Sequence, residues 1–276
     1  MDIIQQVVQK LTLKGYSTST IRGYRQMLQI FINYFPGRDL STVTEEEVKA
    51  FMMHHIAEKR KSRSYQNQLI NAIKFYLEHV LGRPRTYYDL ERPKKVYTLP
   101  SVLSQEEVKA LFSKVHNLKH QAILQTVYGC GLRLSELINL RIRDIDSKRM
   151  VVVIKQRKGA KDRLVPLSPK LLALLRRYFL EYKPQTYLFE GQSGGKYGRR
   201  SVQQIFHKAR VAAGIKKNAS LHTLRHSYAT HLLDAGVNLR SIQVLLGHFS
   251  SKTTEIYTHI SKAHIQKIRS PLDAIT

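Results

Sequence analysis

The sequence predicts a mainly helical protein that has two domains and one small antiparallel β-sheet. Apolar residues recur at a spacing of three and four over most of the chain, which is typical of amphipathic helices. A β-branched run at residues 151–154 is followed by a polar turn and a second short apolar stretch, which indicates a β-hairpin. A charged segment with three prolines, residues 81–104, interrupts the helical periodicity and indicates a domain boundary.

Residues 1–82 are expected to form a compact helical domain. Its four helical segments lie near residues 2–13, 17–35, 44–59 and 64–81, joined by brief connections. The second segment begins after Ser and Thr cap candidates and continues with Ile21, Tyr24 and Leu28 at helical spacing. The third begins at Thr44, and Glu47 follows three residues later, as in a capping box.

Residues 83–102 form the expected linker, and residues 103–276 the expected second domain. This domain opens with "SQEEVKALFSKV", which has a capping-box start, and continues in an apolar helix to Tyr128 and a glycine turn at "GCGLRLSEL". The hairpin strands are expected at Val151–Ile154 and in a stretch that ends at Pro166, with the turn around Gly159. Further helices are expected near residues 168–181, 199–213, 223–235, 238–246 and 251–258, with a last short one from about residue 262.

The chain carries a large excess of positive charge. Its 46 Lys and Arg residues exceed its 20 Asp and Glu residues, which gives a formal net charge of +26. Because 42% of the residues are hydrophobic, the chain can bury a core, and the excess charge then favours a polyanionic partner such as nucleic acid. No basic amphipathic helix stands apart from the folded segments, so an anionic membrane surface is a weaker candidate.

No segment predicts membrane insertion or secretion. The chain has no run of about 18 apolar residues, and its start, "MDIIQQVVQKLTLKGYS", lacks the basic and apolar regions of a signal peptide. We therefore expect a cytoplasmic protein. The single cysteine, Cys130, excludes an intrachain disulfide and a thiolate metal cluster, and its apolar neighbours predict a buried small hydrophobic residue.

One short region near the C-terminus concentrates groups that can act on a phosphate. His222 and Arg225 are three residues apart at the start of an expected helix, so they share one side of it, near its positive end. Four further groups suited to the same chemistry are Arg133, Lys158, His248 and Tyr257.

Together these groups fit the chemistry of a single phosphodiester. The two guanidiniums can hold both non-bridging oxygens and stabilise the charge that develops at phosphorus. Lys158, at the turn of the hairpin, can protonate the leaving 5′-oxygen. Tyr257 supplies a phenolic nucleophile that neighbouring cations activate, and the two histidines provide proton transfer and positioning.

Four segments carry a family resemblance. They are "YGCGLRLSELINLRIRDID", "VVIKQRKGAKDRLVPL", "HTLRHSYATHLLDAGVNLRSIQVLLGH" and "SKTTEIYTHIS", which cover much of residues 127–261. They resemble the signature of the tyrosine site-specific recombinases, the phage-integrase and Xer family, and "GYSTSTIRGYRQMLQIFINYF" resembles its helical, SAM-like core-binding domain. The resemblance implies a catalytic set of Arg133, Lys158, His222, Arg225, His248 and the nucleophile Tyr257, with Glu136 supporting Arg133.

The resemblance also implies a reaction and an assembly. Each strand is cleaved by forming a 3′-phosphotyrosyl link and a free 5′-hydroxyl, so bond energy is conserved and no ATP, metal ion or other cofactor is required. Four protomers are expected on two specific duplex sites, with the C-terminal tail exchanged between neighbours. Chromosome-dimer resolution and integration or excision of a mobile element both fit, with or without a partner recombinase or an accessory protein.

DNA contacts outside the catalytic set are expected from basic and amide side chains. The expected residues are Arg60, Lys61, Arg63, Ser64, Gln66, Lys161, Arg163, Arg199, Arg200 and Gln203. Lys155 and Arg157 share the hairpin with Lys158, so a basic DNA-facing surface is the alternative to a catalytic Lys158. With Lys158 catalytic, Lys161 and Arg163 are expected to contact the DNA backbone or to brace the turn.

Other interpretations remain open. His222 and His226 stand four residues apart, as zinc ligands can, but the glutamate of His-Glu-x-x-His and a third ligand are missing. We therefore expect no metal site, and we expect His226 either to be structural or to support the residues that contact the substrate. Tyr228, the nearest rival nucleophile, lies mid-helix and is expected in the core. A type IB topoisomerase-like enzyme and a non-catalytic DNA-binding regulator are the two alternative functions.

Overall fold

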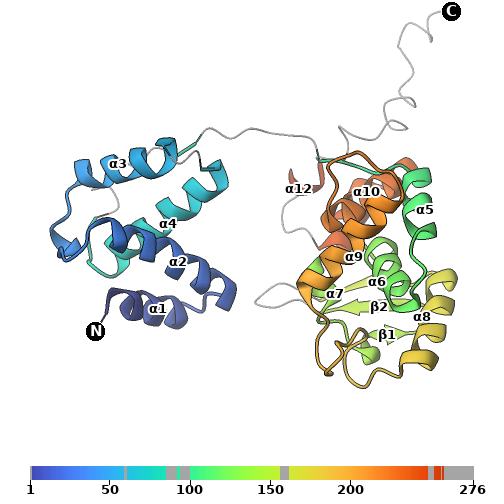
Figure 1. The fold of residues 1–276 in the computed structure, drawn as a ribbon. Coiled ribbons are helices and arrows are strands. Elements are labelled where there is room, and N and C mark those ends of the chain that lie inside the picture. The colour runs from blue at the N-terminus through green and yellow to red at the C-terminus, as the bar shows by residue number, and fades with distance from the viewer. Residues whose placement is uncertain are drawn as a thin grey trace, which may run out of the picture. The chain divides into compact units, whose positions relative to one another are not determined.

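The computed structural model describes residues 2–58, 61–84, 92–93, 100–155, 162–247, 252–255 and 257. The chain divides into two compact units, Met1–Tyr97 and Thr98–Thr276. Figure 1 shows helices in both units and a small sheet in the second. The predicted fold class, mainly helical with one small antiparallel sheet, is confirmed. Among the described residues, no helix is long and apolar enough to cross a membrane.

Four α-helices build the described part of the first unit, close to where the sequence predicts them. They are α1 (Ile3–Leu13), α2 (Thr18–Tyr34), α3 (Glu45–Met53) and α4 (Arg63–His79), with a 3-10 turn, η1 (Leu40–Thr42), before α3. Ser17 and Ser62 cap α2 and α4, because each hydroxyl accepts from the backbone N–H three residues on. Thr44 and Glu47 form the predicted capping box.

The third helix ends differently from the prediction. Instead of continuing as an α-helix to residue 59, α3 passes into a π-helical turn, η2 (His54–Glu58). His55 in this turn is buried, stacks on Phe51 with ring centroids 5.5 Å apart, and places Nε2 2.8 Å from the Tyr65 hydroxyl. We attribute the wider turn to this burial of a polar ring among aromatic neighbours.

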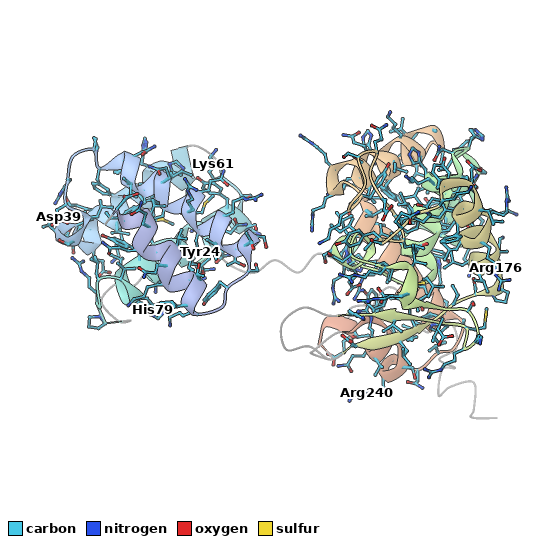
Figure 2. All side chains as sticks on the ribbon, turned by 90° about the horizontal axis from the view of Figure 1, so that it is seen from below. Tyr24, Asp39, Lys61, His79, Arg176 and Arg240 are labelled. Carbon is cyan, nitrogen blue, oxygen red and sulfur yellow. The ribbon has the colours of Figure 1, made fainter. Side chains whose placement is uncertain are left out.

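The core of the first unit lies between α2 and α4. Phe75 of α4 meets Tyr24 of α2 edge-on, with ring centroids 5.6 Å apart. Tyr24 is labelled in Figure 2. Phe31 of α2 is edge-on to Phe51 of α3 at 5.1 Å, and both rings are fully buried. The apolar spacing that predicts the second helix is therefore the face that packs in this core.

The second unit combines helices with a three-stranded antiparallel sheet. Its described helices are α5 (Gln105–Ser113), α6 (Leu118–Gly129), α7 (Leu134–Leu137), η3 (Ile142–Asp144), α8 (Pro169–Tyr182), α9 (Arg199–Ala212), α10 (Leu221–Asp234), α11 (Leu239–Leu246) and α12 (Lys252–Glu255). The sheet has the order β1 (Ile145–Asp146), β2 (Val151–Ile154), β3 (Arg163–Pro166). The pairing of β2 with β3 confirms the predicted hairpin strands, whereas β1 was not predicted because two residues carry no periodicity.

Two predicted helices differ from the structure near the candidate site. Helix α10 begins at Leu221, two residues before its predicted start, so His222 belongs to its first turn. Of the helix predicted over residues 251–258, the structure describes α12 and Tyr257. The helix predicted from about residue 262 lies outside the described residues.

Helix α6 and the turn that follows it position the next part of the chain. Helix α6 packs against α5, α8, α9 and α10, and Cys130 at its end is fully buried, as predicted, where burial raises the pKa of its thiol to about 12. Gly131 has a φ of +59°, and a Cβ atom there would come within 2.6 Å of the Tyr228 ring. This close approach fixes the turn against α10 and directs the chain into α7 at Arg133.

Candidate active site

Arg225 ties three parts of the second unit together. It lies in the second turn of α10, and only 1% of the residue is exposed. Its Nη1 donates to the carbonyl of Gly131 and its Nη2 to the carbonyl of Leu246, both at 2.6 Å. One guanidinium therefore joins α10 to the turn after α6 and to the end of α11.

Arg133 approaches the same place from the start of α7. Its backbone N–H and its Nη1 both donate to Glu136, each at 2.8 Å, and its Nη2 donates to the carbonyl of Gly247 at 3.2 Å. About a third of the side chain, 35%, is exposed, in contrast to the enclosed Arg225. Arg133 can therefore meet a ligand from solvent without leaving its partners.

Glu136 is the common acceptor of this cluster. Besides Arg133, it accepts two hydrogen bonds from Arg163, at 2.8 and 2.9 Å, and lies 3.7 Å from Nη1 of Arg225. Burial alone would raise the pKa of Glu136, but the hydrogen bonds and charge of Arg163, with smaller contributions from the other two arginines, lower it to about 2. The carboxylate is therefore ionised at neutral pH. Its contact with Arg133 is the one the sequence analysis expects.

The same three arginines cap the C-terminal end of α11. The carbonyls of residues 245, 246 and 247 accept from Arg163, Arg225 and Arg133 respectively. These carbonyls have no partner within the helix, and they carry the negative end of its dipole, so cations are favourable there. Gly247 ends the helix in the left-handed region, with a φ of +62°. The chain that leads toward Tyr257 therefore starts from a fixed point.

Arg163 is enclosed in the cluster. The sequence predicts that it contacts DNA or braces the turn, and its side chain is 4% exposed and donates to Glu136 and to the carbonyl of Leu245. The reason is the alternation of β3, which turns positions 163 and 165 inward and positions 164 and 166 outward. Arg163 braces the cluster from the sheet, which is the second of its two expected roles, and its enclosure counts against a DNA contact.

Tyr257 lies beside His226 of α10. Only 1% of Tyr257 is exposed, and its hydroxyl oxygen is 3.0 Å from Nδ1 of His226. Burial raises the pKa of Tyr257, although Arg225 and Arg133 counteract this, so the phenol is protonated at neutral pH. Burial, then the charges of His222 and Arg225, lower the pKa of His226 to about 4. The hydrogen bond therefore joins a neutral phenol to a neutral imidazole.

His222 completes the row along α10. Its ring meets that of His226 edge-on, with centroids 4.4 Å apart. Partial burial, followed by the charges of Arg225 and Arg133, lowers its pKa, so this imidazole is also neutral at pH 7. The structure thus brings together four predicted catalytic residues, Arg133, His222, Arg225 and Tyr257, in a setting that combines cations, neutral imidazoles and a phenol.

The family models decide what kind of chain this is. The model described as "Phage integrase family" matches residues 101–264, and the "Phage integrase, N-terminal SAM-like domain" matches residues 3–86. The chain belongs to the phage integrase family. The predicted recognition as a tyrosine recombinase, with a SAM-like domain before the catalytic one, is confirmed.

The similarity to known proteins extends over nearly the whole chain. It is 36% identical over 273 residues to the putative integrase/recombinase y4qK of Sinorhizobium fredii, covering 98% of this chain and 88% of that protein. It is 35% identical over 274 residues to the tyrosine recombinase XerA of Pyrococcus horikoshii, covering 96% and 92%. A crystal structure of XerA recombinase matches with a TM-score of 0.58 at 26% identity, covering 97% and 99%. A post-cleavage complex of XerH bound to palindromic difH shares the fold, with a TM-score of 0.75 at 20% identity, covering 95% and 81%.

The remaining predicted residues of this integrase-family chain are distributed over both units. Lys61, Arg63 and Ser64 are exposed around the start of α4 in the first unit, where Gln66 is half-buried. Arg199 is exposed at the start of α9 in the second unit. Lys158, His248, Arg60 and Lys161 lie outside the described residues.

Two of the predicted DNA contacts border a hollow beside the row of histidines. Arg200 and Gln203 are exposed on the first turns of α9, and they line a hollow of about 420 Å³ together with His222. The hollow therefore connects the basic start of α9 with the imidazole nearest to solvent.

His226 is the residue that the sequence analysis undervalues. Its contact with Tyr257 depends on the path of the chain after α11, which residue types and spacing do not reveal. One feature of the sequence could have indicated its role. His226 directly follows Arg225 and lies four residues after His222, so it shares a side of the helix with His222.

Proposed function

We propose that this chain is a site-specific DNA recombinase that cleaves and rejoins strands through Tyr257. The observation that carries the proposal is the convergence of Arg133 and Arg225 on one carboxylate, Glu136, beside the row His222–His226–Tyr257. Cations that are held rigidly in place, next to a phenol and two neutral imidazoles, fit the transfer of a phosphoryl group to a tyrosine.

In the proposed reaction, each step exchanges one phosphorus–oxygen ester bond for another. The Tyr257 oxygen attacks the phosphorus of a backbone phosphodiester and gives its proton to a neighbouring base. The bond from phosphorus to the 5′-oxygen breaks, and that oxygen takes a proton from an acid. The products are a 3′-phosphotyrosyl link and a free 5′-hydroxyl. Attack by the 5′-hydroxyl of a second strand reverses the steps and joins the two strands.

The arginines are suited to the phosphate. A guanidinium has five N–H donors in a planar fork, and the backbone carbonyls take two of the Arg225 donors. Glu136 and the end of α11 fix Arg133 and Arg225 before DNA arrives, so stabilising the charge that builds on the non-bridging oxygens requires little reorganisation. Glu136 thus acts as a positioning residue.

Proton transfer is proposed for the basic groups nearest to the reacting oxygens. His222 and His226 are both neutral at pH 7 and can accept the Tyr257 proton, directly or in sequence. By family resemblance, Lys158 protonates the leaving 5′-oxygen and His248 assists at the phosphate. These roles complete the predicted catalytic set.

The proposed substrate is a specific duplex DNA site, and the proposed assembly is a tetramer on two sites. The formal charge of +26 supports a DNA partner. Among proteins of the same fold, XerH is bound to a difH substrate and a lambda integrase tetramer is bound to a Holliday junction. We propose residues 1–82 as the core-binding domain, 83–102 as the linker, and 103–276 as the catalytic domain with an exchanged tail, acting on nucleoid DNA in the cytoplasm.

A nicked suicide duplex from DNA that flanks the gene tests the chemistry. In EDTA and without ATP, the wild-type protein should form a covalent adduct on a denaturing gel, and Tyr257→Phe should abolish the adduct while leaving DNA binding intact. Tyr228→Phe is the matched control, because Tyr228 is a buried tyrosine of the same core and should retain the adduct. If Tyr257→Phe formed the adduct, another nucleophile would be at work.

Paired sites separate the recombinase from its nearest alternative. A recombinase should exchange strands between two duplexes that both carry the mapped site, and should leave a supercoiled plasmid without that site unchanged. Relaxation of any supercoiled plasmid, without exchange, would instead identify a type IB topoisomerase-like activity. Binding without any adduct would identify a DNA-binding regulator.

A further inference from the structure

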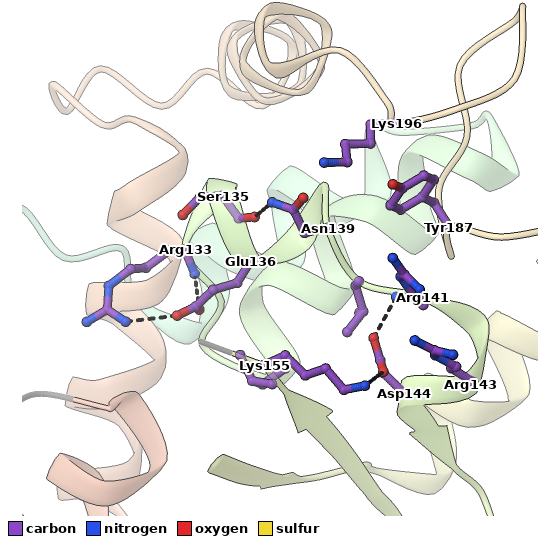
Figure 3. A pocket seen from close by; sticks show the side chains of 12 residues that line it. Arg133, Ser135, Glu136, Asn139, Arg141, Arg143, Asp144, Lys155, Tyr187 and Lys196 are labelled. Carbon is purple, nitrogen blue, oxygen red and sulfur yellow. Dashed lines mark hydrogen bonds and ion pairs between the residues drawn. The ribbon is translucent and has the colours of Figure 1, made fainter. Parts of the chain in front are cut away.

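A second hollow lies on the other side of Arg133, between α7, the turn η3 and the segment around Tyr187. It encloses about 450 Å³, and we call it the basic hollow (Figure 3). The cationic side chains that line it are those of Arg133, Arg141, Arg143, Lys155 and Lys196. Because Arg133 lines this hollow and also belongs to the candidate active site, the hollow borders that site.

The walls of the basic hollow are tied together by backbone hydrogen bonds. Leu188 N donates to the carbonyl of Leu140 at 2.8 Å, and Arg141 pairs with Tyr187 in an antiparallel bridge. The Arg141 guanidinium lies 5.9 Å from the centre of the Tyr187 ring, and the Lys196 ammonium 5.4 Å from it. One aromatic ring thus holds two cations from distant parts of the chain within reach of one ligand.

The positive charge of the basic hollow is only partly compensated. Two carboxylates line it, and one of them, Glu136, is already held by three arginines. The other, Asp144, accepts from the Arg141 backbone N–H at 2.8 Å and lies 3.7 Å from the Lys155 ammonium. In the part of the chain that the structure describes, no carboxylate forms an ion pair with Arg143 or Lys196.

The chemistry of the lining favours a phosphate group. One guanidinium can bind two oxygens of a phosphate at once, and an ammonium group attracts the phosphate as a point charge. Ser135, beside Arg133, and Asn139, between Ser135 and Tyr187, add neutral polar groups to the lining (Figure 3). The Tyr187 ring, with two cations over it, is poorly placed to stack on a nucleobase. A phosphate in a backbone fits this lining better than a nucleotide held by its base.

We propose that the basic hollow binds a DNA backbone phosphate next to the one that Arg133 and Arg225 hold for cleavage. The proposal rests on the proposed function, from which it takes DNA as the ligand and the scissile phosphate as the neighbouring group. Arg143, Lys155 and Lys196 are exposed, so a polymer can enter from solvent and continue on either side. A phosphate held here fixes the strand at a second point, which sets the direction from which the scissile phosphate meets Tyr257.

The test compares two double variants that remove the same charge. Arg143→Gln with Lys196→Gln removes from the basic hollow two exposed cations that form no ion pair with a described carboxylate. The control, Arg176→Gln with Arg177→Gln, removes two exposed cations from α8, where Figure 2 labels Arg176. Helix α8 contributes no residue to this hollow. The affinity for one duplex is measured for each protein by fluorescence anisotropy from about 50 to 200 mM salt, the range over which phosphate contacts dominate.

The expected result is a change in salt dependence. Loss of one phosphate contact lowers the slope of log affinity against log salt by about 0.9 in the hollow variant, a shift of roughly 3.5-fold in relative affinity over that range. The control should keep the wild-type slope. Equal slopes in all three proteins would overturn the proposal. If the double variant unfolds, the single variants Arg143→Gln and Lys196→Gln replace it, provided that each keeps the wild-type melting temperature.

Two further readouts separate the remaining explanations. If inorganic phosphate raised the melting temperature of the wild type but not of the hollow variant, while the DNA slopes were equal, the hollow would bind a free small anion and the proposal would fall. The suicide-duplex adduct is scored on the same proteins. A shifted slope without any wild-type adduct would retain the hollow as a DNA site and reject the cleavage function.

Discussion

His226 Nδ1 lies 3.0 Å from the hydroxyl oxygen of Tyr257, and this contact links the central helix of the candidate site to the proposed nucleophile. Both groups are neutral at pH 7, since burial raises the pKa of the phenol, whereas burial and nearby positive charge lower that of the imidazole to about 4. The imidazole fixes where the phenol points, and it is the nearest described base to which the phenolic proton can go.

Replacing His226 should therefore slow cleavage without weakening DNA binding. His226→Ala removes the hydrogen bond, and we expect a loss of about 10²-fold in the rate of adduct formation on the suicide duplex, the usual size for a misplaced or unassisted nucleophile. Binding affinity should change little, because the side chain lies at the nucleophile rather than along the DNA. An unchanged cleavage rate would reject any role for this contact.

His226→Asn distinguishes positioning from proton transfer. An asparagine can keep a hydrogen bond to Tyr257 but cannot accept its proton at neutral pH. Recovery of most of the wild-type rate with a similar pH profile would make His226 a positioning residue. If it is instead the base, the asparagine variant should stay as slow as His226→Ala. The wild-type rate should then fall only as the pH approaches about 4, where the imidazole becomes charged.

The sequence predicts the elements of this protein better than its contacts. The paired strands and most helices follow from periodicity and capping, and the predicted catalytic residues Arg133, His222, Arg225 and Tyr257 lie together. What could not be predicted is which arginine faces inward. Arg163 is buried because it pairs with Glu136, a carboxylate 27 residues earlier in the chain. A local sequence pattern cannot predict a pairing over that separation.

Glu136 should contribute to stability in a pH-dependent way. Its pKa in the folded protein is about 2, below the value near 4.3 of a free glutamate, so the unfolded chain binds the proton more readily. Its stabilising effect is therefore present above about pH 4.5 and is lost as the pH falls toward 2. At neutral pH, Glu136→Gln should lower the free energy of unfolding by about 2–4 kcal/mol, because three arginines lose a buried partner.

Urea unfolding of the wild type and Glu136→Gln between pH 7 and pH 3 measures this effect. The difference between the two proteins should shrink as the pH falls. Glu181→Gln, an exposed glutamate on α8, is the matched control and should unfold like the wild type at every pH. A difference between wild type and Glu136→Gln that stayed constant down to pH 3 would mean that the carboxylate is not the group responsible.

Arg163→Lys tests whether this residue braces the fold or contacts DNA. Lysine keeps the charge but cannot form both hydrogen bonds to Glu136 and the one to the Leu245 carbonyl. We therefore expect the free energy of unfolding to fall by about 2 kcal/mol. The salt slope of DNA binding should not change, because the side chain is enclosed. Arg163→Gln removes the charge as well, and a salt slope lowered by about 1 in that variant, with unchanged stability, would instead indicate the DNA contact that the sequence predicts.

Gly131→Ala should disturb the turn that delivers Arg133. Its φ of +59° disfavours any residue with a Cβ atom, and the added methyl group would lie 2.6 Å from the Tyr228 ring, which is itself packed in the core. We expect the free energy of unfolding to fall by about 2–3 kcal/mol, the sum of backbone strain and overpacking. Urea denaturation measures this loss, and Gly214→Ala supplies the control, because Gly214 has a similar φ of +68° but open space around it. If both variants lost the same stability, backbone strain alone would account for the effect, and the contact between the turn and α10 would not constrain Arg133.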